Sequence, residues 1–442
     1  MRDENEQVRR LFSDDYRQGD DRDEFQRDRD IVLYSSALHR LSTITQVASG
    51  ESGHVFHNRL THTLQVAQVG RRLAEKLKIK QPELARIHHL NEDVVETACL
   101  AHDLGHPPFG HLAEEELNRL AGDEAQGFEG NAQSFRIVTE LAFRDDGYSG
   151  LNLTNRSLRA ILKYPWTFSG RPKEKQNKWG AYDSELDSFK VAFRKNEVAP
   201  FRRSAEAELM DWSDDLTYAI HDVEDFYRAG LIPLHLLLPS APGSRSTAER
   251  ERFLQHVAGK DSKPDELKNV PEAELDEILA GILFANFVLT GPYEGKRQER
   301  ARLRVFTSRL VGRYINGLQL AEPSDSGETV HVDEDLRKQL ALLKQLTWYY
   351  VIDAAGLGVQ QHAHRQVIKY LFEVFLEEAK KSPSRLLPPY YRERLAKVQV
   401  SEPAVHRVVA DLIAGMTETQ CLMMYHRLNG FVPGSALDKL IV

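Results

Sequence analysis

The chain has 442 residues, of which 41% are hydrophobic and 28% are charged, and its formal net charge is −8. A chain of this length and composition buries a large core, as one extended domain or as a domain with an elaborated second lobe. The acidic balance argues against nucleic acid as the main ligand, although a local basic patch is compatible with it.

Cysteine content and hydropathy indicate the cellular compartment of the protein. Only two cysteines occur, Cys99 and Cys421, which excludes a disulfide framework and a cysteine-based zinc site. No apolar run reaches the length of a membrane span, and the charged N-terminus does not resemble a signal peptide. We therefore expect a cytoplasmic protein that does not engage a membrane.

Hydrophobic periodicity predicts helices along most of the chain. Residues 1–30 are rich in Asp, Glu and Arg and predict a charged, flexible N-terminal segment. Apolar residues recur at near-helical spacing over 31–47, and over 59–77 a wide stripe that includes Leu64 predicts a mostly buried helix. Further helices are predicted at 94–104, 112–120, 131–143, 155–163, 205–228, 273–290, 297–320, 334–353, 366–378, 405–416 and 419–428.

Two segments lack a clear helical pattern. Residues 166–200 carry Lys, Arg, Gly and Trp without periodicity and predict a long excursion or flap, whereas 239–272 predict a surface connection or a helical hairpin. Strand signals are scarce throughout, so the predicted fold class is all-α.

The densest group of metal-ligand side chains lies in residues 102–111, with the sequence HDLGHPPFGH. Neutral imidazoles and a carboxylate form a ligand set for a divalent metal. The two prolines cannot continue a helix, so His102 and Asp103 are expected at a helix end, where neighbouring side chains can converge on one ion. The alternative is a helix that simply stops beside polar residues.

Two other segments offer further ligands. His62 lies on the buried 59–77 helix, where an imidazole with no partner is costly; alone it reads as a satisfied core histidine, but the 102–111 stretch favours a ligand. Asp214, Tyr218 and Asp222 recur at intervals of four, which places them on one helix face over about 12 Å. An acidic face turned to solvent is the alternative for these residues.

The order of His62, His102-Asp103 and Asp214 resembles that of HD-domain metal-dependent phosphohydrolases. Further strings resemble the deoxyguanosine triphosphate triphosphohydrolase family, more generally deoxynucleoside triphosphate triphosphohydrolases: Phe25–Asp30, Thr45–Val47, His57–Thr63, Phe128–Gln133, Asp214–Tyr218 and Ile413–Thr417. The resemblance runs from about residue 25 to residue 430. The sequence departs from the family pattern at Leu38–Leu41, at Ile44 and at Glu418.

The resemblance implies an HD-domain helical core over 31–230 and an additional helical C-terminal region over 231–442 that completes the pocket and the oligomer contacts. It also implies hydrolysis of deoxynucleoside triphosphates, dGTP and other dNTPs, at the α-phosphate to deoxynucleoside and tripolyphosphate. One divalent metal, Mn²⁺, Mg²⁺ or Fe²⁺, would be held by four side chains: His62, His102, Asp103 and Asp214.

Roles for other residues combine the resemblance with local spacing. His111 and Glu114 are three residues apart on a predicted helix and can touch, so they form a candidate acid/base dyad, with His106 assisting. Favourable acids in a first helical turn are the alternative for Glu114. Cationic candidates for the triphosphate are Arg59 and Lys163, and Tyr218 is a candidate to bond phosphate or to stack on the sugar. The resemblance assigns the 3′-hydroxyl to Gln46 and Asp222. Packing of Val47 and Tyr218 against C2′ would exclude ribose.

Partners and rival functions are also expected from the resemblance. A homo-oligomer, hexameric or trimer-based, and a nucleotide or single-stranded DNA effector are implied. The rival enzyme is an HD-type phosphodiesterase or nucleotidase that uses a second metal. The rival of another class is a nucleotide- or single-stranded-DNA-binding regulatory protein on the same fold.

Overall fold

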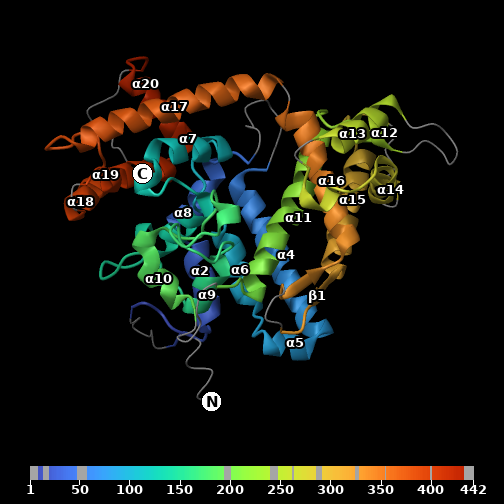
Figure 1. Cartoon of the computed structure of the whole chain (residues 1–442), viewed down its shortest axis with the longest axis horizontal. Helices are drawn as coiled ribbons and strands as arrows, with labels where there is room; N and C mark the ends of the chain where they lie inside the picture. Colours follow the sequence, from blue (N-terminus) through green and yellow to red (C-terminus); the bar gives the residue numbers. More distant parts are fainter. Residues whose placement is uncertain are drawn as a thin grey trace.

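The computed structural model describes residues 8–12, 19–46, 57–193, 201–238, 247–260, 263–284, 291–323, 328–353, 355–398 and 401–432. These residues are helical almost throughout, which confirms the all-α prediction (Figure 1). One antiparallel pair of short strands interrupts the helices, β1 (Leu318–Leu320) and β2 (Val330–Val332), with Leu318 opposite Val332. Strands of three residues are too short to show an alternating pattern in the sequence.

The N-terminal half carries most of the predicted helices near their expected bounds. Its helices are α2 (Glu24–Leu33), α3 (Ser36–Arg40), α4 (Arg59–Lys80), α5 (Pro82–Ile87), α6 (Glu92–Ala101), α7 (His111–Ala121), α8 (Gly130–Arg136), α9 (Asn155–Ile161), α10 (Leu186–Val191) and α11 (Ala205–Arg228). A π-helical turn follows α8 at Ile137–Leu141, and short 3-10 turns occur at Leu41–Thr43, Asp123–Ala125, Lys173–Lys175 and Asp183–Glu185.

The C-terminal half is also helical. Its helices are α12 (Leu234–Leu237), α13 (Ala248–Gly259), α14 (Glu272–Phe284), α15 (Arg297–Asn316), α16 (Glu334–Thr347), α17 (Ala355–Ala379), α18 (Pro389–Lys397), α19 (Glu402–Gly415) and α20 (Glu418–Leu428). A 3-10 turn lies at Asp265–Leu267 and a second π-helical turn at Trp348–Ile352. None of the helices that the structure describes is long and apolar enough to cross a membrane.

The core centres on α6, which packs against α2, α4, α9 and α11. Asp93 to Ala101 of α6 are almost all buried, and Cys99 is fully buried there. Helices α4 and α6 approach closely at Gly70, where an added Cβ would lie 2.6 Å from the Cys99 sulfur. This packing fixes the two helices that position three of the four predicted metal ligands, His62, His102 and Asp103.

Two expectations about exposure are wrong. Helix α2 begins at Glu24, inside the segment predicted to be flexible, and Asp28 is completely buried. The Asp28 carboxylate pairs with Arg10 at 2.7 Å and accepts hydrogen bonds from Thr154, so a charge-rich stretch becomes part of the core. Conversely, Leu64 on α4 is 43% exposed although it lies in the predicted buried stripe.

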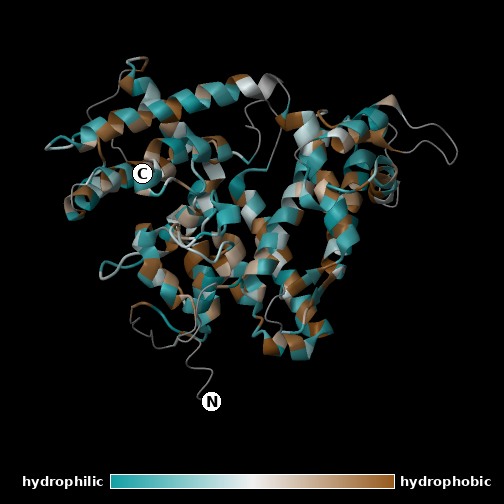
Figure 2. Cartoon of the chain, viewed as in Figure 1, coloured by the Kyte–Doolittle hydropathy of each residue, from teal (hydrophilic) through white to brown (hydrophobic). Residues whose placement is uncertain are grey.

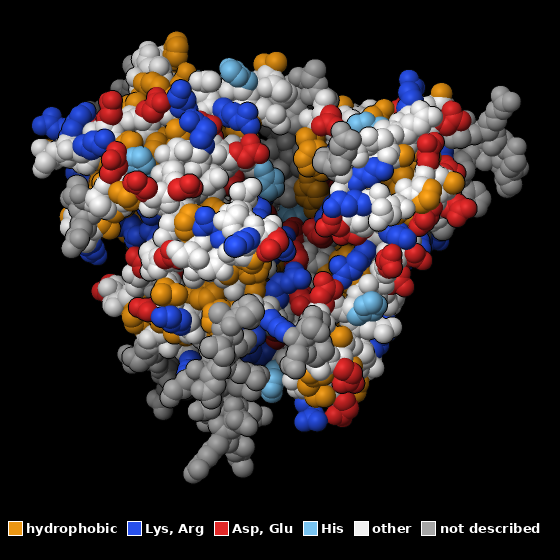
Figure 3. Space-filling view, viewed as in Figure 1, with side chains coloured by type: hydrophobic (Ala, Val, Ile, Leu, Met, Phe, Trp, Pro, Cys, Tyr) orange, Lys and Arg blue, Asp and Glu red, His pale blue; other side chains and the backbone are white. Residues whose placement is uncertain are grey.

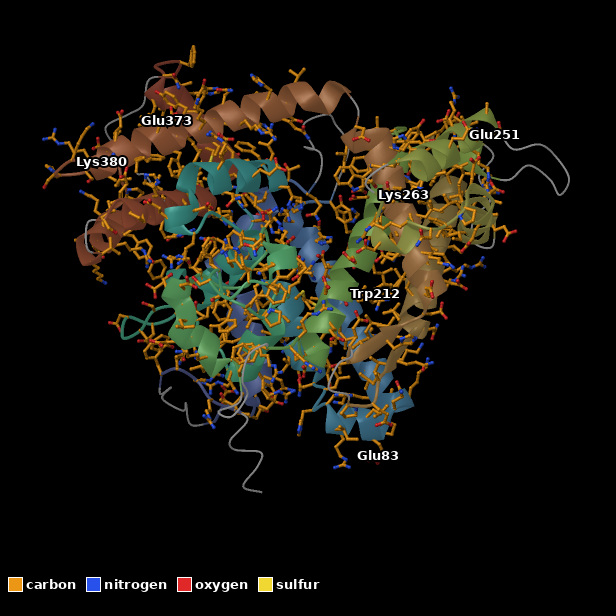
Figure 4. The ribbon with its side chains drawn as sticks, viewed as in Figure 1. Glu83, Trp212, Glu251, Lys263, Glu373 and Lys380 are labelled. Atoms are coloured by element: carbon orange, nitrogen blue, oxygen red, sulfur yellow. The ribbon has the colours of Figure 1, made fainter. Side chains whose placement is uncertain are left out.

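The C-terminal helices flank the N-terminal core on two sides. Helices α15 and α16 pack on α11, and Figure 4 shows Trp212 of α11 lying toward them, with its ring 6.3 Å from that of Tyr314. Helix α17 packs along α7, α19 and α20 and alternates hydrophilic and hydrophobic segments, as expected for a helix with one buried face (Figure 2). A buried ion pair at 2.8 Å between Arg136 and Asp411 joins α8 to α19.

Candidate metal and active site

Three helices bring the four predicted metal ligands together. His62 comes from α4, His102 and Asp103 follow the last turn of α6, and Asp214 comes from α11. The Asp214 Oδ1 atom lies 3.0 Å from His62 Nε2 and 3.4 Å from His102 Nε2, and Asp103 Oδ1 lies 3.5 Å from His102 Nε2. The helix end at Ala101 therefore allows both residues of the His-Asp pair to face one point.

The surroundings of His102 fit a metal ligand. Its Nδ1 lies 2.6 Å from the carbonyl oxygen of Cys99, which fixes Nδ1 as the donor and leaves Nε2 to coordinate. That Nε2 atom is buried and makes no hydrogen bond. Burial lowers the pKa of His102, but the carboxylates of Asp103 and Asp214 outweigh burial and raise it to about 9, so the cluster attracts a cation. Two imidazoles and two carboxylates form a donor set for a divalent ion.

Asp103 is also held from its other side. Arg59 Nη1 donates to Asp103 Oδ2 at 2.9 Å, and His106 Nδ1 lies 2.9 Å from Asp103 Oδ1. Burial and the nearby Arg59 guanidinium lower the pKa of His106 to about 4, so this imidazole is neutral near pH 7. Arg59, predicted for the triphosphate, lines the cavity and also donates to Asp103, a predicted metal ligand.

The predicted dyad is formed in the first turn of α7. His111 Nδ1 lies 3.0 Å from Glu114 Oε2, and the other Glu114 oxygen accepts a hydrogen bond from the Gly130 amide. Burial opposes ionisation of Glu114, but its hydrogen bond with His111 and the charge of Lys178 hold its pKa well below the usual range. The His111 side chain is 73% exposed, so its remaining ring nitrogen is available to the cavity.

These groups open onto one cavity of about 610 Å³. Figure 3 shows the hollow at the centre of the molecule, between α7 and α17 on one side and α16 on the other, with acidic and basic side chains gathered along it. Ten predicted residues line the cavity: Gln46, Arg59, His102, Asp103, His106, His111, Glu114, Lys163, Asp214 and Tyr218.

Three predicted residues stand apart from the cavity wall. His62 is buried behind the other ligands. Asp222 is buried too and reaches the wall only through its hydrogen bond with Tyr218. Val47 lies outside the residues that the structure describes.

Two lysines extend the cationic side of the cavity. Lys163 Nζ lies 2.6 Å from Asp211 Oδ1 and 4.0 Å from Asp214, a predicted metal ligand. Lys178 lies 3.1 Å from Glu129 and 3.7 Å from Glu114. Lys178 could not be predicted from the sequence, because the 166–200 segment that contains it has no periodic pattern.

The C-terminal half supplies a further wall that sequence reasoning did not predict residue by residue. Its lining residues are Lys344, Trp348, Ile352, Gln360, Gln361, His364, Arg365 and Glu418. They come from α16, the second π-helical turn, α17 and α20, and no local sequence pattern links them to the HD motif.

A second group of metal-ligand side chains lies beside the first. Ligand atoms of His106, His111 and Glu114 lie within 4.8 Å of one another, close enough to hold an ion. Such an ion would be the second metal of the phosphodiesterase alternative. Lys178, 3.7 Å from Glu114, places a positive charge beside this group, as does Arg59, whose charge acts on His106. Both cations oppose the binding of a second divalent ion there.

Comparisons with known proteins agree with this geometry. Residues 59–178 match the HD domain model, and residues 330–427 match the phosphohydrolase-associated domain model. The chain is 36% identical to a deoxyguanosinetriphosphate triphosphohydrolase-like protein of Streptomyces coelicolor, with 92% of each chain covered. Proteins with the same description from Corynebacterium efficiens and Shewanella woodyi are 35% and 29% identical, covering 92% and 97% of each chain.

The HD match spans His62, His102, Asp103, His111 and Glu114, and the associated match spans all eight cavity-lining residues contributed by the C-terminal half. The chain is therefore a hydrolase of the HD-domain family and belongs to the deoxyguanosinetriphosphate triphosphohydrolase-like proteins.

Proposed function

We propose that this protein hydrolyses deoxynucleoside triphosphates, dGTP and other dNTPs, at the α-phosphate and releases deoxynucleoside and tripolyphosphate. One observation carries the proposal: the His102–Asp103–Asp214 cluster and the His111–Glu114 dyad line the same cavity. A phosphoryl group seated there would meet the metal cluster and a proton-transfer group together.

The ligand cluster would hold one divalent ion, Mn²⁺, Mg²⁺ or Fe²⁺, through His62, His102, Asp103 and Asp214. When bound, such an ion supplies Lewis-acid polarisation of a phosphate oxygen and of a water molecule. Arg59 holds the second oxygen of Asp103 and so fixes the orientation of that carboxylate.

Proton transfer is assigned to His111. Hydrolysis adds the water oxygen to the α-phosphorus, breaks the bond to O5′ and moves one proton from the water to O5′. His111 serves this transfer by accepting the proton of the water or by donating to O5′. Glu114 orients the imidazole and raises its basicity through the 3.0 Å contact with Nδ1. The neutral His106 beside it assists without adding charge.

Substrate contacts are assigned to cationic side chains in the cavity and to buried side-chain oxygens that lack a hydrogen-bond partner. Lys163, Arg59 and Lys178 balance the charge of the triphosphate. The side-chain oxygen of Gln46 is buried and has no hydrogen-bond partner, so it suits a donor such as the 3′-hydroxyl. One oxygen of Asp222 is likewise buried without a partner, and its other contact is Tyr218.

The proposal extends to sugar selectivity, oligomeric state and regulation. Tyr218 and Val47 would pack against C2′ of the sugar and exclude ribose by steric conflict. We propose a hexameric or trimer-based homo-oligomer in the cytoplasm, with a nucleotide or single-stranded DNA as effector.

Incubation with each dNTP and NTP in the presence of Mn²⁺ or Mg²⁺, followed by chromatography of the products, tests the proposal. We expect tripolyphosphate and deoxynucleoside in equal amounts, and little reaction with NTPs. Release of orthophosphate or pyrophosphate instead would overturn it. Elemental analysis should find one tightly bound ion per chain, whereas two ions would favour the phosphodiesterase alternative.

A further inference from the structure

The start of α20 is tied to the 102–111 loop. The half-buried Arg40 donates from its guanidinium to the carbonyl oxygens of Leu104 and His106, each at 2.8 Å, and to that of Met416 at 3.2 Å. One side chain thus joins the loop that carries the HD motif to the residues that precede α20. Glu418, the first residue of α20, lies two positions further along the chain.

Glu418 reaches back to two separate segments of the N-terminal core. Its Oε1 accepts hydrogen bonds from the backbone amides of Thr45 at 2.8 Å and Phe109 at 3.2 Å. Its Oε2 accepts from the Thr45 hydroxyl at 2.8 Å. Three donors on one carboxylate give a short and directional link, because hydrogen bonds to an ionised acceptor are stronger than neutral ones.

The two segments that Glu418 joins border different parts of the cavity. Thr45 directly precedes Gln46, whose buried side-chain oxygen accepts no hydrogen bond within the protein. Phe109 lies two residues before His111 and has φ +68°, a left-handed conformation that a residue with a side chain rarely adopts. The Phe109 ring stacks on His364 of α17 at 4.0 Å, so the strained turn is held by two C-terminal helices.

We propose that Glu418 is a positioning residue that fixes the distance between Gln46, at the sugar end of the cavity, and His111, at the reacting phosphate. The turn at 107–110 determines the position of His111 at the start of α7. Glu418 links that turn by hydrogen bonds to residues 45–46, the segment proposed to bind the sugar. Proton transfer by His111 then depends on correct seating of the 3′-hydroxyl on Gln46. This inference rests on the proposed function for its account of the substrate.

The first test compares Glu418→Ala with Thr417→Ala, using a dNTP and the matching 2′,3′-dideoxynucleoside triphosphate. Misplacement of a reacting group by about 1 Å can cost on the order of 100-fold in rate. We expect Glu418→Ala to lower kcat for the dNTP by about 10- to 100-fold. The dideoxy substrate, which has no 3′-hydroxyl to seat, should lose much less, so the preference for the 3′-hydroxyl should collapse.

Thr417→Ala is the matched control because Thr417 caps α20 through the Gln420 amide and leaves the Glu418 contacts in place. It should lower the melting temperature and keep the substrate preference of the wild type. Glu418→Gln, which retains one carbonyl acceptor, should restore part of kcat. An equal loss on both substrates in Glu418→Ala, or the same collapse in Thr417→Ala, would overturn the coupling.

Hydrogen–deuterium exchange tests the link without any substrate. In Glu418→Ala the amides of Thr45 and Phe109 lose their acceptor, so exchange should accelerate in 44–46 and 107–111 together. Thr417→Ala should accelerate exchange in α20 alone. Unchanged exchange at both segments in Glu418→Ala would refute the positioning role, even if the wild type proves to act on another phosphoester.

Discussion

His102 and His111 lie nine residues apart and line one cavity, but their immediate neighbours differ and favour different roles. His102 is buried among carboxylates with Nε2 free of hydrogen bonds, which suits a metal ligand. His111 is exposed to the cavity and bonded through Nδ1 to Glu114, which suits proton transfer.

Alanine substitution of each histidine should therefore abolish activity for a different reason. We expect His111→Ala to abolish turnover while one metal ion stays bound, because none of the four proposed ligands changes. His102→Ala should lose the ion as well as the activity. Turnover assays combined with elemental analysis of the purified variants separate the two outcomes. Residual turnover near the wild-type rate in His111→Ala would contradict its assigned role.

His57, just before α4, should make stability depend on pH. Asp225 Oδ2 lies 2.7 Å from both the backbone nitrogen and Nδ1 of His57, while Glu224, Arg228 and the stacked ring of His221 also face the imidazole. Burial lowers the pKa of His57, but the hydrogen bond and charge of Asp225 outweigh it, so the pKa is raised. The pair then stabilises the fold fully below the unfolded pKa of about 6.5 and progressively less as pH rises through the folded pKa.

Urea unfolding at about pH 6 and about pH 9 measures this linkage. The wild type should exceed His57→Gln in free energy of unfolding at the lower pH, and the difference should shrink at the higher pH. A difference that is constant, or that grows with pH, would show that the charged His57–Asp225 pair does not stabilise the fold.

At the scale of elements, Gly105 allows the 102–111 loop to pack in close contact with the backbone of α8. A Cβ on Gly105 would lie 2.1 Å from the Gly130 carbonyl oxygen and 2.2 Å from the Ser134 amide, both backbone atoms. The Ser134 hydroxyl also bridges the Gly105 amide and the His102 carbonyl oxygen. Only a residue without a side chain allows this contact.

Gly105→Ala should therefore destabilise the protein by about 3 kcal/mol, the upper range for overpacking, because backbone has to move. Gly312→Ala on α15 is the control: its added Cβ meets nothing within 4 Å. Alanine in a helix interior should stabilise the control by about 0.5–1 kcal/mol. Equilibrium urea unfolding followed by circular dichroism measures both, and equal stabilities for the two variants would contradict the close approach.

Helices with apolar periodicity could be predicted from the sequence, and elements without it could not. Helix α11 has the predicted bounds because its buried positions recur along the whole segment. Helix α17 begins at Ala355, before the predicted start at 366, because residues 355–365 include two glycines and a Gln- and His-rich run, which give no continuous apolar stripe. The exposure of Leu64 could not be predicted either, since periodicity shows which face is apolar but not how far its partner helices extend.

At the scale of the whole molecule, the grouping of the four proposed metal ligands could be predicted from the sequence, and the far wall of the cavity could not. His62, His102, Asp103 and Asp214 stand in a recognisable order along the chain. Lys344, Trp348, Gln361 and Arg365 become neighbours of that cluster only because α16 and α17 fold back onto α11 and α7. Such contacts depend on tertiary packing, and one sequence carries no local signal for them.

The metal cluster itself should act as a cross-link of the fold. Its ligands come from α4, the end of α6 and α11, the three helices that pack together at the centre of the core. An ion that binds only the folded chain stabilises it by about 2.7 kcal/mol at about one hundred times its Kd. Chelation should therefore lower the melting temperature of the wild type, and re-addition of Mn²⁺ should restore it.

Two variants make this prediction specific. His102→Ala lacks a ligand, so its melting temperature should respond little to chelator or to Mn²⁺. His39→Ala removes an exposed histidine outside the cluster and should respond as the wild type does. Differential scanning calorimetry with and without chelator makes the comparison. A chelator shift of equal size in His102→Ala would show that the stabilising ion does not depend on the His102 imidazole and would contradict the proposed ligand set.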